Sequence, residues 1–267
     1  MMCTDKDDTN KLFSGLEKLG FSDLNVDLYK NEEKVRLTQL KLKERGNSYL
    51  YERTVKCPVC NAEFKCPSVK TSAPRVLKRE SDFFIIYGNV NPYFYDVWVC
   101  NSCGYAALKV DFPKIREFQK ELIFKNITSK WRGREYKVPF DENIAIERYK
   151  LALLNAVVTN CKDSTKAMLC LKIAWMYRLK EVPNDEIIFI EKSLEGFVNA
   201  FEKEAFPIYG MDKFTTMYLL GELNRRIGNN EKSLIWMSKV ITTPGVSSRL
   251  KELARDQKDL IKSIDLN

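Results

Sequence analysis

The sequence of 267 residues contains no histidine. This absence excludes zinc fingers that use two cysteines and two histidines, H-E-x-x-H metalloproteases, Ser-His-Asp triads and Cys-His nucleophile pairs. Histidine is also the side chain that most often transfers protons near neutral pH. An enzyme built on this sequence would therefore need tuned Glu, Lys, Cys or Tyr groups, or a cofactor, and the composition favours binding over catalysis.

Long apolar runs are also missing. No stretch approaches the ~18 consecutive apolar residues of a membrane-spanning helix. The first eight residues, Met-Met-Cys-Thr-Asp-Lys-Asp-Asp, are polar and acidic and lack the basic start and apolar centre of a secretory signal. We therefore expect a cytoplasmic protein that does not interact with a membrane.

Cysteine is the residue type that the sequence does supply, with eight in all. Four of them form two C-x-x-C pairs, Cys57/Cys60 and Cys100/Cys103. One such pair fits on a single tight turn, so that both sulfurs can reach one ion at about 2.3 Å. Four thiolates would close a tetrahedral shell and leave no position for a reacting water, which predicts one structural Zn²⁺. An iron–sulfur cluster and a redox dithiol are the alternatives, but the first usually has other spacings and the second explains only one pair.

The other cysteines lack this spacing. Cys66 follows Cys60 by six residues and is expected to be a bystander thiol in the β-rich region, with a substituted ligand or a reactive group as the alternatives. Cys161 and Cys170 fall in helical segments and are expected to be small core residues. Cys3 lies in the N-terminal tail.

The net charge of +8 is concentrated in the first half of the chain. A zinc ion with four thiolates carries a charge of about −2, which neutralises part of this excess. The remainder could face nucleic acid through a basic set around and after the first Cys pair. This set consists of Lys70, Arg75, Lys78 and Arg79. Aromatic residues follow it between Phe83 and Trp98, and the simpler interpretation is that they fill a small core.

The chain divides into three parts by composition. Residues 1–50 read as a tail and a polar helix, too poor in apolar residues to fold alone. Residues 51–135 read as a zinc-ribbon module with a following helix, and residues 136–267 as an all-helical domain, with the boundary in the polar segment that contains Gly133 and Pro139. The predicted fold class is α+β, with a small β-rich zinc ribbon of four cysteines followed by an all-α array that resembles tetratricopeptide repeats.

Within the module, residues 75–87 and 94–99 are β-prone runs, the first of them a strand or a pair of strands. Asn61 and Gly104 follow the Cys pairs at positions that suit a tight turn around a metal. The period then becomes helical, and Ile115, Phe118, Leu122 and Ile127 fit one helix face. Further helices are predicted at 141–160, with Asp141 as the cap, and at 165–180, 184–205, 212–227, 230–242 and 247–264.

The segment Met217–Ser233 resembles a tetratricopeptide repeat. Leu220-Gly221, Gly228 and Ser233 stand where such a repeat has its first-helix Leu-Gly pair, its turn glycine and its second-helix small residue. Asn224 replaces the expected aromatic residue. Residues 173–177, Ile-Ala-Trp-Met-Tyr, show the same small-then-aromatic pattern, but Ala174 precedes Gly221 by 47 residues rather than ~34. The array is therefore irregular or carries an insertion near 180–187, and an ordinary helical bundle is the alternative.

The motif Cys57-Pro58-Val59-Cys60 and the segment Tyr95–Ala107 together resemble a bacterial family known only as a domain of unknown function, number 2225. Leu12–Leu16, Asp27–Tyr29 and Asn91-Pro92 add to the resemblance, which covers residues 12–125 well and the helices loosely. It implies the zinc ribbon and the architecture but no activity.

Three functions remain open at this point. The favoured one is a non-catalytic zinc-binding adaptor that binds a macromolecule, most simply a protein, through its helical repeats. The second is a nucleic-acid-binding protein that uses the basic zinc-ribbon half. The third is an enzyme of unknown type that uses Cys66 or a group of carboxylates.

Overall fold

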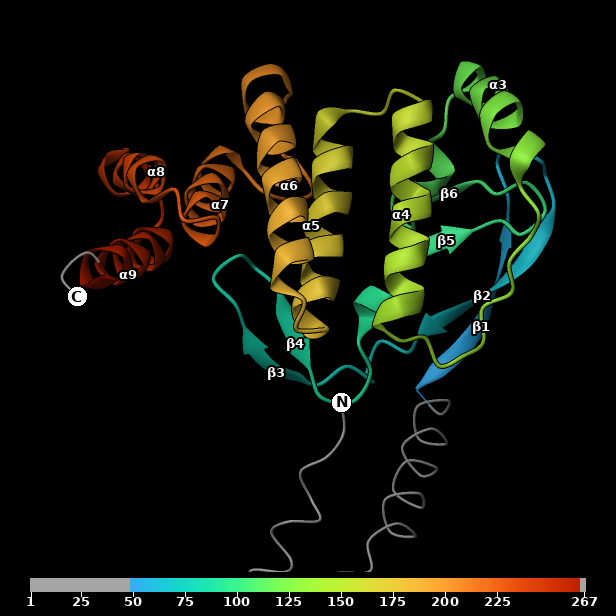
Figure 1. Cartoon of the computed structure of the whole chain (residues 1–267), viewed down its shortest axis with the longest axis horizontal. Coiled ribbons are helices and arrows are strands. Elements are labelled where there is room, and N and C mark those ends of the chain that lie inside the picture. The colour runs from blue at the N-terminus through green and yellow to red at the C-terminus, as the bar shows by residue number, and fades with distance from the viewer. Residues whose placement is uncertain (1–48, 265–267) are drawn as a thin grey trace, which may run out of the picture. The chain divides into compact units, whose positions relative to one another are not determined.

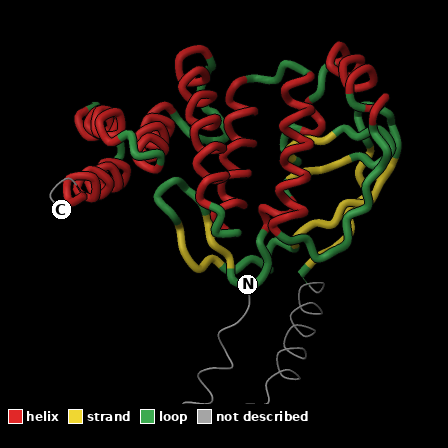
Figure 2. The backbone as a smooth tube through the Cα atoms, in the orientation of Figure 1, coloured by secondary structure: helices red, strands yellow, loops and turns green. Residues whose placement is uncertain are grey.

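The structure is a computed structural model that describes residues 49–264, and these residues belong to one compact unit. Strands come first and helices follow (Figures 1 and 2). The predicted α+β class, with a β-rich part that carries the cysteine cluster ahead of an all-helical part, is confirmed. The predicted tail and polar helix of residues 1–50, and Cys3, lie almost wholly outside the described residues.

The described strands pair into three separate antiparallel hairpins. These are β1 (Leu50–Lys56) with β2 (Glu63–Val69), β3 (Val76–Arg79) with β4 (Ile85–Tyr87), and β5 (Val97–Val99) with β6 (Ala106–Leu108). The β-prone run 75–87 is thus a pair of strands. The run 94–99 is a strand only from Val97, because Asn91 caps a 3₁₀ turn over Pro92–Tyr95 by accepting a hydrogen bond from the Tyr93 N–H at 3.0 Å.

The helices of the described chain lie close to their predicted positions. They are α3 (Glu117–Asn126), α4 (Glu142–Val158), α5 (Asp163–Leu179), α6 (Pro183–Lys203), α7 (Lys213–Arg226), α8 (Asn230–Thr242) and α9 (Ser248–Ile264). Asp141 caps α4 as predicted, since its carboxylate accepts a hydrogen bond from the Ile144 N–H at 2.8 Å. Asp212 caps α7 in the same way, through the Thr215 N–H at 2.7 Å.

The helix face predicted from Ile115, Phe118, Leu122 and Ile127 is correct at Ile127, which is buried, and wrong at Phe118. Phe118 is 55 % exposed, whereas Ile123 and Ile127, four residues apart, are buried. Ile115 precedes the first residue of the helix, so it cannot set the phase of the helical face. The inward face is therefore set by Ile123 and Ile127, which pack beside the cysteine cluster.

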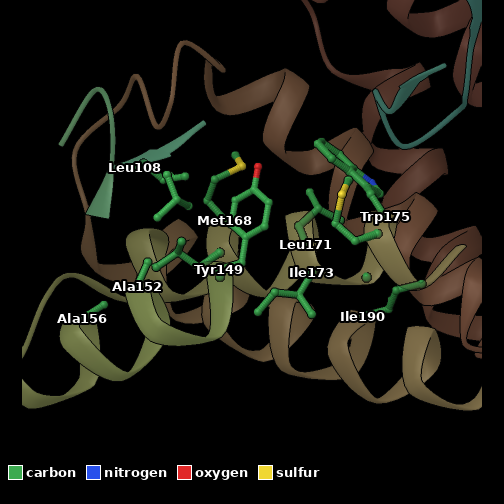
Figure 3. Close-up of a cluster of buried hydrophobic side chains, with 14 of the residues drawn as sticks. Leu108, Tyr149, Ala152, Ala156, Met168, Leu171, Ile173, Trp175 and Ile190 are labelled. Carbon is green, nitrogen blue, oxygen red and sulfur yellow. The ribbon is translucent and has the colours of Figure 1, made fainter. Parts of the chain in front are cut away.

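The largest hydrophobic core joins the strands to the helices across the predicted boundary near residue 135. Val97, Val99 and Leu108 of β5 and β6 share one buried cluster with α4 and α5. Figure 3 shows Tyr149 of α4 between Met168 and Leu171 of α5, with Leu108 beyond Met168. Buried Arg148 of the same helix donates from its guanidinium to the Val97 carbonyl.

The tip of the β3–β4 hairpin is held on α5 and α7 by buried charges. The fully buried Asp82 carboxylate accepts hydrogen bonds from the Arg178 guanidinium at 2.6 and 3.2 Å and from the Trp175 indole N–H at 3.0 Å. Ser81 donates to the equally buried Glu222 at 2.6 Å, and Arg226 pairs with the same carboxylate at 2.8 Å. The hairpin therefore covers the sides of α5 and α7 that carry Arg178 and Glu222.

Candidate metal centre

Two short turns with the same backbone geometry carry the four paired cysteines. In the turn between β1 and β2, the Cys57 N–H donates to the Ala62 carbonyl at 2.9 Å and the Asn61 N–H donates to the Cys57 carbonyl at 3.0 Å. The turn between β5 and β6 has the same two hydrogen bonds. The Cys100 N–H donates to the Tyr105 carbonyl at 2.9 Å, and the Gly104 N–H donates to the Cys100 carbonyl at 2.8 Å.

The last residue of each turn has a left-handed backbone, with φ of 61° at Asn61 and 76° at Gly104. Asparagine and glycine are the residues that adopt this conformation most readily. The sequence-based assignment of these two positions to the cysteine turns is therefore confirmed.

The two turns bring the four sulfurs together. All four Sγ atoms lie within 4.8 Å of one another. The Sγ atoms of Cys57 and Cys103 are 3.7 Å apart, and those of Cys60 and Cys100 are 3.6 Å apart. Tetrahedral coordination with metal–sulfur bonds of about 2.3 Å places sulfurs about 3.8 Å apart, whereas a disulfide bond measures only about 2.05 Å. The sulfurs are thus spaced to share a cation.

Hydrogen bonds among the thiols show why this cluster needs positive charge. The bond with Cys100 is the main cause that raises the pKa of Cys57, to about 12, and it raises the pKa of Cys103 as well. The bonds that Cys103 and Cys57 make with it lower the pKa of Cys100 to about 2. The cysteines therefore stabilise one thiolate at the expense of the others, and a divalent cation supplies the charge that would let all four ionise.

The segment after α3 fixes the second turn from outside. The Trp131 indole N–H donates to the Asn101 carbonyl at 2.7 Å, and the Thr128 hydroxyl donates to the Cys103 carbonyl at 2.9 Å. A Cβ added at Gly104 would lie 2.8 Å from the Trp131 ring, so only glycine fits beneath it. The sequence analysis missed Trp131 and Thr128. A single tryptophan in an otherwise polar segment was the available signal.

Buried apolar side chains surround the cluster. Val55, Val59, Tyr105 and Phe112 pack around it together with Ile123 and Ile127. Cys57, Cys100 and Cys103 are almost completely shielded from solvent, and Cys60 is partly exposed. Such a closed shell of sulfur ligands suits a metal that stabilises structure.

The remaining described cysteines lie outside the cluster. Cys66 is buried in β2, and burial raises the pKa of its thiol to about 11. Cys170 is buried in α5, and burial likewise raises its pKa to about 11. Cys161 is partly exposed between α4 and α5, 3.2 Å from the Thr159 hydroxyl.

The basic set is exposed, whereas the aromatic residues that follow it are buried or half-buried. Lys70 and Arg75 lie in the loop between β2 and β3, and Lys78 and Arg79 lie in β3, whose four residues are all exposed. Lys78 pairs with Glu80 at 2.6 Å. The aromatic rings instead turn into the core. Among them, Phe84 is fully buried and stacks on Trp175 with 5.3 Å between ring centroids.

The helical pair α7 and α8 shows the close approach that its small residues suggest. A Cβ added at Gly221 would lie 3.0 Å from Met237, and the Ser233 hydroxyl donates to the Gly221 carbonyl at 2.8 Å. Asn224, which replaces the expected aromatic residue, is buried and donates to the Leu220 carbonyl. That the helices form an irregular array resembling tetratricopeptide repeats, rather than an ordinary bundle, stays a prediction.

Fold and cluster together define an α+β protein with four cysteines placed to hold one metal ion. Residues 50–261 match the model of an uncharacterized protein family conserved in bacteria, DUF2225, and the chain belongs to this family. The match includes the helices and does not include residues 12–49, where the sequence analysis placed part of the resemblance.

A curated relative in Borreliella burgdorferi, an uncharacterized protein, is 26 % identical over 174 residues. The match covers 54 % of this chain and 59 % of the relative. No solved structure matches the chain. Within residues 49–264, no helix is both long enough and apolar enough to cross a membrane.

Proposed function

We propose that the protein is a non-catalytic adaptor in which one structural Zn²⁺ fixes the β-rich part and the helices bind a protein partner. The proposed structural Zn²⁺ is supported by the four cysteine sulfurs that two matching turns bring together. They close a tetrahedral shell and leave no coordination position for a substrate. Cys57, Cys60, Cys100 and Cys103 are the proposed ligands, and zinc suits four sulfur ligands at this spacing.

Metal analysis of purified, fully reduced protein tests the proposed zinc. We expect one zinc per chain and no iron, and the Cys103→Ser variant should lose the metal together with stability. Cys170→Ser is the matched control, because it also removes a buried thiol but lies in α5. Protein without stoichiometric metal, or an equal zinc content in both variants, would contradict the proposal.

The proposal that the helices bind a protein partner rests on their paired arrangement and on apolar side chains that stay exposed on them. Stacked helical pairs are widely used to bind proteins. The β3–β4 hairpin covers the sides of α5 and α7 that face it. The surface proposed for a partner is therefore on the sides of the helices that face away from this hairpin. Ile187 and Ile188 of α6 and Ile235 of α8 are 40–55 % exposed and are the proposed contacts with a partner.

Cross-linking of the full chain in its native cells tests this surface. A partner that uses it should be captured by the unchanged protein and lost with Ile188→Glu and Ile235→Glu. Val138→Glu introduces the same charge at an exposed valine outside the helices and should leave capture intact. Equal capture by all three variants would contradict partner binding through this surface.

Binding to nucleic acid is the second candidate, and the exposure of Lys78 and Arg79 in β3 and of Arg75 just before this strand favours it. It requires affinity for single strands that falls steeply with salt. Affinity should then be lost when these residues and Lys70 are changed to glutamine, and retained when Lys251 and Lys262 of α9 are changed in the same way. Binding that is absent or insensitive to salt would rule the candidate out.

A further inference from the structure

A cavity of about 690 Å³ lies beside the metal centre, where the β-rich part meets the helices. Its volume falls within the roughly 300–1,000 Å³ of small-molecule sites, and junctions between structural parts are common places for them. The wall is formed by β6, the start of α3, the end of α4, the start of α5 and the loop between α6 and α7. Neither the proposed metal nor the proposed partner surface uses this space.

The floor of the cavity is apolar and is made of small side chains. Ala106 and Leu108 of β6 face Ala152 and Ala156 of α4, with Leu169 of α5 beyond them. Figure 3 shows Ala152 and Ala156 one turn apart on α4, with Leu108 above them.

The acidic groups in the wall are already satisfied by the protein. The Asp111 carboxylate accepts a hydrogen bond from the Tyr209 hydroxyl at 2.6 Å and pairs with Lys114 at 3.0 Å. The Glu204 carboxylate accepts from the N–H and the hydroxyl of Ser164 at 2.9 and 2.6 Å. Lys114 neutralises the charge of Asp111, whereas Glu204 keeps its charge and is held in position by Ser164.

The basic groups of the wall are turned toward solvent. Arg116 and Lys162, at the starts of α3 and α5, are exposed and line the cavity together with Lys114. Both helices direct the positive ends of their dipoles to this side. The wall also keeps an unpaired acceptor, because the Asn155 side chain is 2 % exposed and its Oδ1 accepts no hydrogen bond from the described residues.

We infer that this cavity binds an amphipathic organic anion, whose apolar body lies on the alanine floor and whose carboxylate, sulfonate or phosphate head faces Arg116 and Lys162. A wholly apolar ligand would leave the basic rim unpaired. An inorganic anion would leave the apolar floor uncovered. The inference does not depend on the identity of the metal or on a protein partner.

Titration with 8-anilinonaphthalene-1-sulfonate, followed by its fluorescence, tests the site on the full chain loaded with zinc. The probe combines an apolar body with one sulfonate, and decanoate should displace it. Ala205→Phe introduces a ring at an exposed wall residue, and Ala156→Leu fills the floor. We expect each to weaken probe binding at least tenfold. Val157→Leu is the control on the exposed face of α4 and should change nothing.

The charge of the site is tested separately. Arg116→Gln and Lys162→Gln should each weaken the probe about threefold to tenfold and reduce its salt dependence, whereas Lys232→Gln on α8 should not. Unchanged affinity in both Ala205→Phe and Ala156→Leu would overturn the cavity as the site. Equal binding of the uncharged parent compound N-phenyl-1-naphthylamine, together with no effect of the glutamine variants, would overturn the anionic head.

Discussion

Gly104 offers the sharpest test of how the second cysteine turn is built, because two separate features require glycine there. Its φ is 76°, a conformation that side chains with a Cβ rarely adopt. The Cβ of an alanine at this position would also lie 2.8 Å from the ring of Trp131. The Gly104→Ala variant therefore adds backbone strain and a steric clash at the same place.

The expected loss of stability has three contributions: the backbone strain, the displacement of the Trp131 ring and the hydrogen bond that is lost with it. The left-handed backbone destabilises alanine by about 1–2 kcal/mol. Displacement of a packed ring typically adds about 1–3 kcal/mol. The hydrogen bond from Trp131 to the Asn101 carbonyl would be lost with the ring, at about 0.5–1.5 kcal/mol. We expect the free energy of unfolding to fall by about 2.5–6.5 kcal/mol in all.

Gly228→Ala provides the matched control. Gly228 has a nearly identical φ of 78°, but an added Cβ would meet no atom within 4 Å. This variant should show the backbone term alone, about 1–2 kcal/mol. Urea unfolding of the zinc-loaded proteins, followed by tryptophan fluorescence, measures both. If Gly104→Ala is no less stable than Gly228→Ala, the reasoning about Trp131 is refuted.

Three further predictions concern the buried charges, the thiols and the metal. Burial opposes ionisation of Asp82, but Arg178 and Arg226 outweigh it and hold its carboxyl pKa below the ordinary value, so this contribution to stability is present above about pH 4 and is lost as the pH falls through the folded-state pKa. Asp82→Asn should reduce the free energy of unfolding at neutral pH by about 3–5 kcal/mol and weaken its acid dependence, and an acid limb identical to that of the unchanged protein would contradict this. Maleimide labelling with mass spectrometry at neutral pH should modify partly exposed Cys161 before Cys66, whose pKa is about 11, and the reverse order would restore Cys66 as a reactive residue. Removal of metal by a chelator should increase hydrogen exchange around both cysteine turns and in α3 far more than in α8 and α9, which have a buried cluster of their own, and a uniform increase would contradict the central role of the metal.

The sequence was sufficient to predict those features that depend on local spacing. The two C-x-x-C pairs predicted which sulfurs meet, because a turn of that length allows few arrangements. Helix positions followed from apolar periodicity and from the Asp141 cap. Asn61 and Gly104 were identified because few residues tolerate a left-handed backbone.

Features that depend on contacts between distant segments were not predictable in this way. Trp131 contacts the second cysteine turn from 30 residues further along the chain, and Asp82 meets Arg178 across 96 residues. Phe118 was grouped on one helix face with Ile127, and periodicity shows which residues share a face but not which part of that face is covered. The cavity is lined by residues between Tyr105 and Gly210 that come from several elements, so spacing in the sequence does not reveal it.

The described strands show why a metal would stabilise this protein. They form three separate two-stranded sheets, and an isolated two-stranded hairpin is at best marginally stable in water. The β5–β6 hairpin has Val97, Val99 and Leu108 in the main core. By contrast, the β1–β2 hairpin contributes its buried residues Val55 and Cys66 only to the smaller cluster around the sulfurs. A cation bound by Cys57 and Cys60 of one turn and by Cys100 and Cys103 of the other would join the weaker hairpin to the stronger one. The closed shell of ligands is what that task requires, since an ion with an open position would expose this small core to water.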